Sequence, residues 1–75
     1  MYTAEEAREQ SWNNSLAALM KHIDHEVQLS TDIGAFSAGF DPDPWPATVV
    51  GEAVKELREV GYEVIEGTNE VIIEW

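Results

Sequence analysis

The chain has 75 residues, including 15 Asp or Glu, 4 Lys or Arg and no Cys, which gives a formal net charge of −11 at pH 7. This length allows one small domain, residues 1–75, and the missing cysteines exclude disulfides and thiolate metal sites. The charge argues against direct binding to nucleic acid or to an anionic membrane, because both need clustered Lys and Arg.

The first expected element is a helix over residues 3–29. Thr3 and Glu6 have the spacing of a capping box, in which the Thr3 hydroxyl accepts from the Glu6 amide and the Glu6 side chain reaches back to the Thr3 amide. Apolar residues three or four positions apart then form one stripe: Trp12, Leu16, Leu19, Met20, Ile23 and Val27. Toward the N-terminus this stripe meets Glu9 and Glu5, so we expect the first two turns to overhang the core.

Residues 30–46 indicate a break, a possible short strand and a linker. Ser30 to Gly34 is expected to end the helix. Residues 35–40 form a possible strand, with Phe36, Ala38 and Phe40 on one face. The three prolines of residues 41–46 exclude a helix interior and predict an extended linker.

A second helix and a hairpin are expected to complete the chain. The helix, residues 47–60, would bury Val50, Ala53, Val54, Leu57 and Val60 and would end at Gly61 in the left-handed conformation. Residues 62–75 alternate with period two around Gly67-Thr68-Asn69, which is typical of a hairpin. The order predicts an α+β fold with the helices on one face of a small antiparallel sheet.

Two segments carry a resemblance to a known group of proteins. They are Thr3-Ala4-Glu5-Glu6-Ala7-Arg8 and Leu57-Arg58-Glu59-Val60-Gly61-Tyr62-Glu63-Val64, the latter followed by Gly67 and Ile72-Ile73-Glu74-Trp75. In these the chain resembles small accessory proteins of tailed bacteriophages. Glu74 stands where similar chains often have Ser, and residues 41–46 depart from the pattern in their proline content. The resemblance implies a phage-encoded protein in the cytoplasm of the host cell and names no partner.

Carboxylates form the first candidate binding surface. Glu52, Glu56, Glu59 and Glu63 recur every three or four residues, and Glu70 and Glu74 would lie with Glu63 on the outer face of the hairpin. Carboxylates one helical turn apart are about 5–6 Å from each other, which is comparable to the phosphate spacing of a nucleic-acid strand. Such a surface would dock on a basic protein, and the alternative is a solvated face that only keeps the protein soluble.

An apolar patch is the second candidate surface. Ile65 and Ile72 are expected on the face of the hairpin away from the core, and Trp12 and Trp45 would add to the patch unless a helix or the linker buries them. The segment from His22 to Glu26 has two histidines among carboxylates. We predict no metal site there, because a firm site needs three or four ligands and a third His is absent.

These features favour a binding protein over an enzyme. The serines lack the sequence context of a nucleophile, no phosphate loop is present, and no cofactor is predicted. The leading hypothesis is an acidic protein that engages or inhibits a host protein with a basic surface, such as a defence or nucleic-acid-handling factor. Two alternatives remain open: an oligomer that sequesters a small nucleotide against Trp12, Trp45 or Tyr62, and a minor virion or assembly component.

Overall fold

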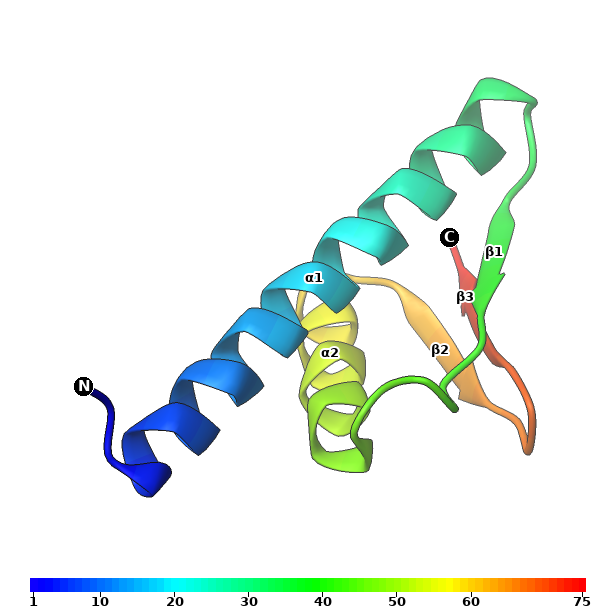
Figure 1. Ribbon diagram of the computed structural model, residues 1–75. Helices are drawn as coiled ribbons and strands as arrows, with labels where there is room; N and C mark the ends of the chain where they lie inside the picture. The colour runs from blue at the N-terminus through cyan, green and yellow to red at the C-terminus, as the bar shows by residue number, and fades with distance from the viewer.

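The computed structural model describes residues 1–75, and its elements follow the expected order (Figure 1). The elements are α1 (Ala4–Asp32), β1 (Ser37–Phe40), α2 (Ala47–Glu59), β2 (Glu63–Glu66) and β3 (Val71–Glu74). The three strands form an antiparallel sheet in the order β1-β3-β2. Both helices pack on one face of this sheet, so the predicted α+β fold is confirmed.

Helix α1 begins at its predicted cap and ends later than expected. The Thr3 hydroxyl accepts a hydrogen bond from the Glu6 amide, as predicted, but the Glu6 carboxylate accepts from the Thr3 hydroxyl instead of reaching the Thr3 amide. The helix continues to Asp32 because Ser30 and Thr31 do not break it. The stop is Gly34, whose φ of 80° allows two closing hydrogen bonds, from Gly34 N to Thr31 O and from Ala35 N to Ser30 O.

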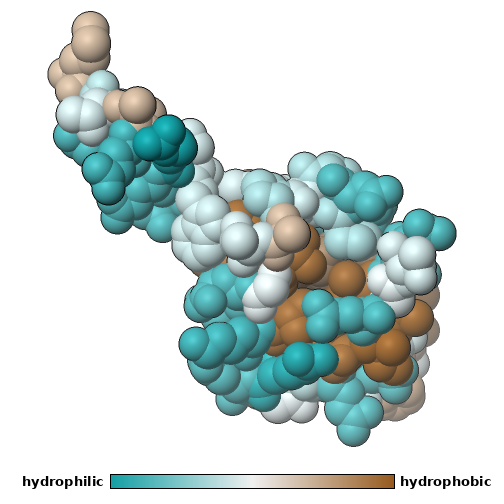
Figure 2. Space-filling view, turned by 90° about the horizontal axis from the view of Figure 1, so that it is seen from below, coloured by the Kyte–Doolittle hydropathy of each residue, from teal (hydrophilic) through white to brown (hydrophobic).

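The first turns of α1 overhang the rest of the molecule, as the acidic interruption of its stripe predicts. Leu19 and Ile23 are the buried residues of this 29-residue helix. The other members of the predicted stripe are half-buried and pack against the core. Figure 2 shows the result: a hydrophilic arm projects from a body on whose visible face the apolar side chains gather.

The segment between β1 and α2 turns, where an extended linker was expected. The Trp45 amide donates to the Pro42 carbonyl at 3.1 Å, and the Asp43 amide donates to the Asp41 carboxylate at 3.0 Å. These two bonds fold residues 41–46 into a turn. The strand before it is also shorter than residues 35–40, and Phe36, which lies just outside it, is exposed while Phe40 is buried.

Alternation along the three strands separates the two faces of the sheet. Phe40, Val64, Val71 and Ile73 point toward the helices and are buried. They pack in one core with two residues of α1 and five of α2: Leu19, Ile23, Val49, Val50, Ala53, Val54 and Leu57. The side chains between them on the strands therefore point to the opposite face, which no helix covers.

The predicted stripe of α2 is correct except at its ends. Val60 was expected in the core, but it is the C-cap residue and is 73% exposed. Val49 was not expected there, and it is completely buried. Gly61, with φ 101°, ends the helix as predicted, and the bonds from Gly61 N to Arg58 O and from Tyr62 N to Leu57 O repeat the closing pattern of α1.

Two glycines in and after α2 should respond oppositely to substitution by alanine. Gly61→Ala should lower the free energy of unfolding by about 1–2 kcal/mol, because a Cβ is strained at positive φ. Gly51→Ala should raise it by about 0.5–1 kcal/mol, because Gly51 is exposed inside the helix and a Cβ there meets nothing. Urea unfolding of both variants measures the difference, and equal effects would contradict the assigned end of α2.

Candidate interaction surface

The uncovered face of the sheet places two isoleucines side by side between carboxylates. Ile65 of β2 is paired in register with Ile72 of β3. Two residues away along the strands, on the same face, Glu63 is paired with Glu74. Ile65 is 51% exposed and Ile72 is half-buried, although both lie on the strands that form the core. The prediction that these isoleucines point away from the core is therefore confirmed. We call Glu63, Ile65, Glu70, Ile72 and Glu74 the outer sheet face.

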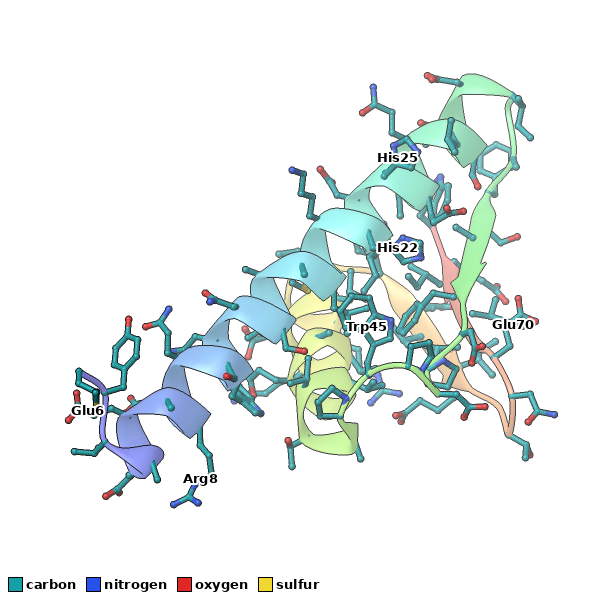
Figure 3. All side chains as sticks on the ribbon, viewed as in Figure 1. Glu6, Arg8, His22, His25, Trp45 and Glu70 are labelled. Carbon is teal, nitrogen blue, oxygen red and sulfur yellow. The ribbon has the colours of Figure 1, made fainter.

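Glu70 lies at the end of this face opposite to Glu63 and Glu74. It directly precedes β3, and its side chain lies across Gly39 of β1, where a Cβ would collide with the carboxylate. Figure 3 shows Glu70 beside β1. Glycine at position 39 thus allows a carboxylate to approach the backbone of the edge strand.

No positive charge offsets these carboxylates on the same face. The four basic residues, Arg8, Lys21, Lys55 and Arg58, all belong to the helices. Arg58 alone forms an ion pair, with Glu66 at 3.9 Å, and both side chains are about half exposed. Such a pair contributes little to stability. The outer sheet face therefore presents charge of one sign around a small apolar centre.

The predicted acidic surface is split into two groups by the fold. Glu52 and Glu56 are half-buried and Glu59 is exposed on α2, in the helical layer. Glu63, Glu70 and Glu74 lie on the far side of the sheet. A single row running from the helix into the strand is therefore wrong, because the chain turns at Gly61 and Glu63 emerges on the opposite face.

The predicted apolar patch is divided in the same way. Trp12 and Trp45 are half-buried and pack against the core from the helical side, while Ile65 and Ile72 lie on the outer sheet face. Trp12 is fixed by a hydrogen bond from its Nε1 to the Thr48 hydroxyl at 2.9 Å. The four residues thus belong to two separate surfaces.

The histidines of α1 are both exposed and do not converge with the carboxylates. His22 lies beside Trp45, with ring centroids 6.4 Å apart (Figure 3). Nowhere in the structure do three or more His, Asp or Glu side chains come together in a way that could hold a metal ion.

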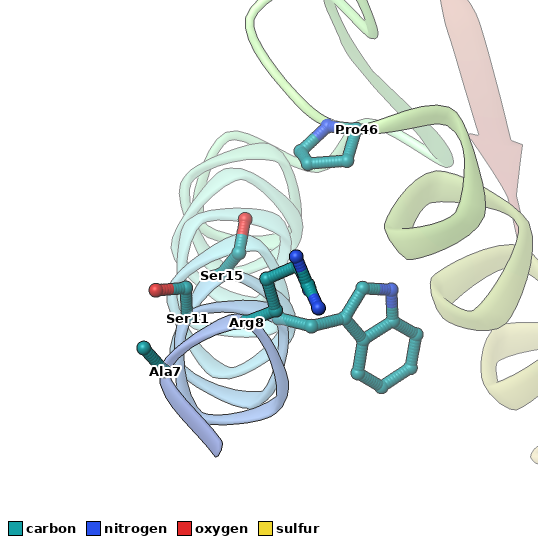
Figure 4. Close-up of a pocket in the computed structure, with 6 residues that line it drawn as sticks. Ala7, Arg8, Ser11, Ser15 and Pro46 are labelled. Carbon is teal, nitrogen blue, oxygen red and sulfur yellow. The ribbon is translucent and has the colours of Figure 1, made fainter. Parts of the chain in front are cut away.

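A cleft of 460 Å³ lies where the arm of α1 leaves α2. It is lined by Ala7, Arg8, Ser11, Trp12, Ser15 and Pro46. Figure 4 shows Arg8, Ser11 and Ser15 along α1, with Pro46 across the opening. Trp45 and Tyr62, the other aromatic candidates for stacking a base, are not part of this lining.

The structure also exposes Ile33, which the sequence did not single out, and Phe36, which was expected on one face of a strand. Ile33 is 84% exposed and Phe36 is 74% exposed, on the stretch that leads from α1 into β1. Periodicity could not identify Ile33 because it lies after the end of α1 and before β1. The one available signal is that residues 33–40 carry no charge in an otherwise highly charged chain.

Comparison with known proteins adds no assignment. The sequence matches no protein-family model, and no curated protein or solved structure is a significant match to it. No helix combines the length and hydropathy that a membrane span requires. The functional argument therefore rests on the geometry described above.

The Trp12–Thr48 contact should be measurable as a coupling between the two helices. Trp12→Phe and Thr48→Val should each cost about 0.5–1 kcal/mol, because each removes the same hydrogen bond. The double variant should cost less than the sum of the two single variants when measured by urea unfolding. Full additivity would show that the bond does not contribute to holding α1 on α2.

Proposed function

We propose that this protein is a non-enzymatic, acidic binding protein whose outer sheet face docks on a basic surface of a partner protein. The observation that carries the proposal is the pairing of Ile65 with Ile72, flanked by the Glu63–Glu74 pair at one end and by Glu70 at the other, on a face without Lys or Arg. A small apolar centre with a charged rim is the usual anatomy of a protein interface.

The two kinds of residue would make different contributions to binding. The carboxylates would steer a basic partner and speed association, and salt would weaken that contribution. Ile65 and Ile72 would lose water on contact and so slow dissociation. The two isoleucines would therefore lengthen the lifetime of the complex, which charge alone does not do.

The identity of the partner is supported only by the resemblance of two segments to phage accessory proteins. On that basis we propose that the protein is phage-encoded, acts in the host cytoplasm and engages or inhibits a host protein, such as a defence or nucleic-acid-handling factor. A partner of that kind presents clustered Lys and Arg for its own nucleic-acid ligand.

Two matched charge reversals test which side of the molecule binds. Replacing Glu63, Glu70 and Glu74 by Lys should abolish capture of the partner from a host lysate at low ionic strength. Replacing Glu52, Glu56 and Glu59 by Lys changes the net charge equally and should leave most of the capture, because these residues lie in the helical layer.

A third variant separates charge from apolar contact. Ile65→Ser with Ile72→Ser should shorten the lifetime of the complex with little change in association rate. If the sheet-face charge reversal binds like the wild type, the proposed surface is wrong. If both charge-reversal variants lose binding equally, binding depends on net charge and not on which face carries the carboxylates.

A second candidate function is favoured by the cleft beside Trp12. An indole, an arginine without an ion-pair partner and two serines line this cleft. This combination suits a small anion with an aromatic group, such as a nucleotide, because the indole can stack on a base while Arg8 approaches the phosphate.

Mass spectrometry of ligands released from the purified protein tests this alternative. A nucleotide should be found with the wild type and lost in Arg8→Ala, whereas Lys21→Ala, which removes a basic residue outside the cleft, should retain it. A folded wild-type protein that releases no nucleotide, and that binds none added in solution, would remove this function.

A further inference from the structure

The two edges of the sheet are protected to different degrees. At the β2 edge, Arg58 Nη2 donates to the Val64 carbonyl at 3.0 Å, so an outward-facing backbone acceptor is already satisfied. Glu63 and Glu66 add charge to the same strand, and Glu66 pairs with Arg58. Charged side chains of this kind are the usual means of preventing an edge strand from pairing further.

The β1 edge has no comparable protection. The Trp75 amide donates to the carbonyl of Phe36, the residue directly before β1, so the residues of β1 that bond to β3 are Ala38 and Phe40. The N–H and C=O groups of Ser37 and Gly39 therefore point to the open edge. No side-chain hydrogen bond reaches them, and β1 itself contains neither charge nor proline.

The surroundings of this edge have two distinct chemistries. On the outer side, Glu70 lies over Gly39, and Asp41 follows the strand directly. At the end where the chain enters from α1, Ile33 and Phe36 expose most of their surface. Alternation puts Phe36 on the side of Ala38 and Phe40, opposite Glu70, so an added strand would meet carboxylates on one face and the Phe36 side chain on the other.

The small area of the outer sheet face also indicates that the β1 edge takes part in binding. Three strands of four residues cover about 14 by 13 Å, from the usual strand spacing and rise. A stable interface takes about 800 Å² from each partner. The outer sheet face alone is too small, and β1 is the neighbouring element that can enlarge it.

We propose that β1 is a docking edge for an extended peptide segment of the partner, with basic residues alternating with apolar ones, which adds as a fourth strand. The inference rests on the proposed function, since the same basic partner would cover the outer sheet face. Basic side chains of the segment would approach Glu70, and apolar ones would cover Phe36. Backbone bonds to Ser37 and Gly39 would supply affinity, as in other strand additions.

Charge favours this occupant over a second copy of the chain. Two copies would bring together two molecules of net charge −11, each with Glu70 and Asp41 beside the edge. A basic segment instead gains attraction from both carboxylates.

The test uses the full chain and a labelled peptide of about eight residues that alternates Lys and Val. Fluorescence anisotropy gives its affinity for the wild type, Ser37→Pro and Ser37→Ala. Proline removes the outward N–H while sparing the bonds to β3, and alanine removes only the hydroxyl. We expect about a tenfold weaker complex for Ser37→Pro and wild-type affinity for Ser37→Ala.

A second probe does not depend on the folding of any variant. The same peptide methylated on alternate backbone nitrogens keeps its charge but cannot pair with β1, and it should also bind about tenfold more weakly. Equal binding of methylated and unmethylated peptides, or no binding of either one, would overturn the proposal.

The remaining outcomes separate this inference from the proposed function. If the sheet-face charge reversal abolishes binding while peptide methylation does not matter, the outer sheet face is correct and the β1 edge is wrong. If methylation matters but replacing only Glu63 and Glu74 by Lys does not, the edge binds and the proposed function fails. A wild-type dimer that Ser37→Pro converts to a monomer, with no peptide bound, would identify the second copy as occupant and refute the proposal.

Discussion

The structure depends on packing one face of a very small sheet against two helices. Val71 and Ile73 of the central strand belong to the same core as Leu19 and Ile23 of α1, and the five buried residues of α2 complete it. No polar or charged residue is buried. All 15 carboxylates must therefore remain at the surface, and the strand alternation that buries one set of side chains exposes the other. The outer sheet face is a direct consequence of this core.

That constraint also explains why charge and apolar surface coincide. A three-stranded sheet covered on one side leaves Ile65 and Ile72 without a layer above them. Glu63, Glu70 and Glu74 surround them and keep the face hydrated. Burial on one side and exposure on the other are thus two results of the same short strands, and a partner would complete the missing layer.

Local signals in the sequence predicted most of the elements. The Thr3 cap, the α1 stripe, Gly61 and the outward isoleucines could be identified because each depends on neighbours within a few residues. The boundary at which α1 ends could not be identified. Ser30 and Thr31 are compatible with either helix or loop, so Gly34 determines where α1 stops. The grouping of the acidic residues also failed, because it depends on how the chain turns after α2, which helical spacing does not contain.

The protruding arm has a consequence for how the protein behaves in solution. The molecule extends 47 Å in one direction and 24 and 22 Å in the others, and its radius of gyration is 13.6 Å. A compact chain of this length would have a radius of gyration of about 11 Å. Its frictional drag is therefore that of a larger particle, and a monomer will elute from a sizing column ahead of globular standards of equal mass. Light scattering, which reports mass independently of shape, avoids mistaking this elongation for association.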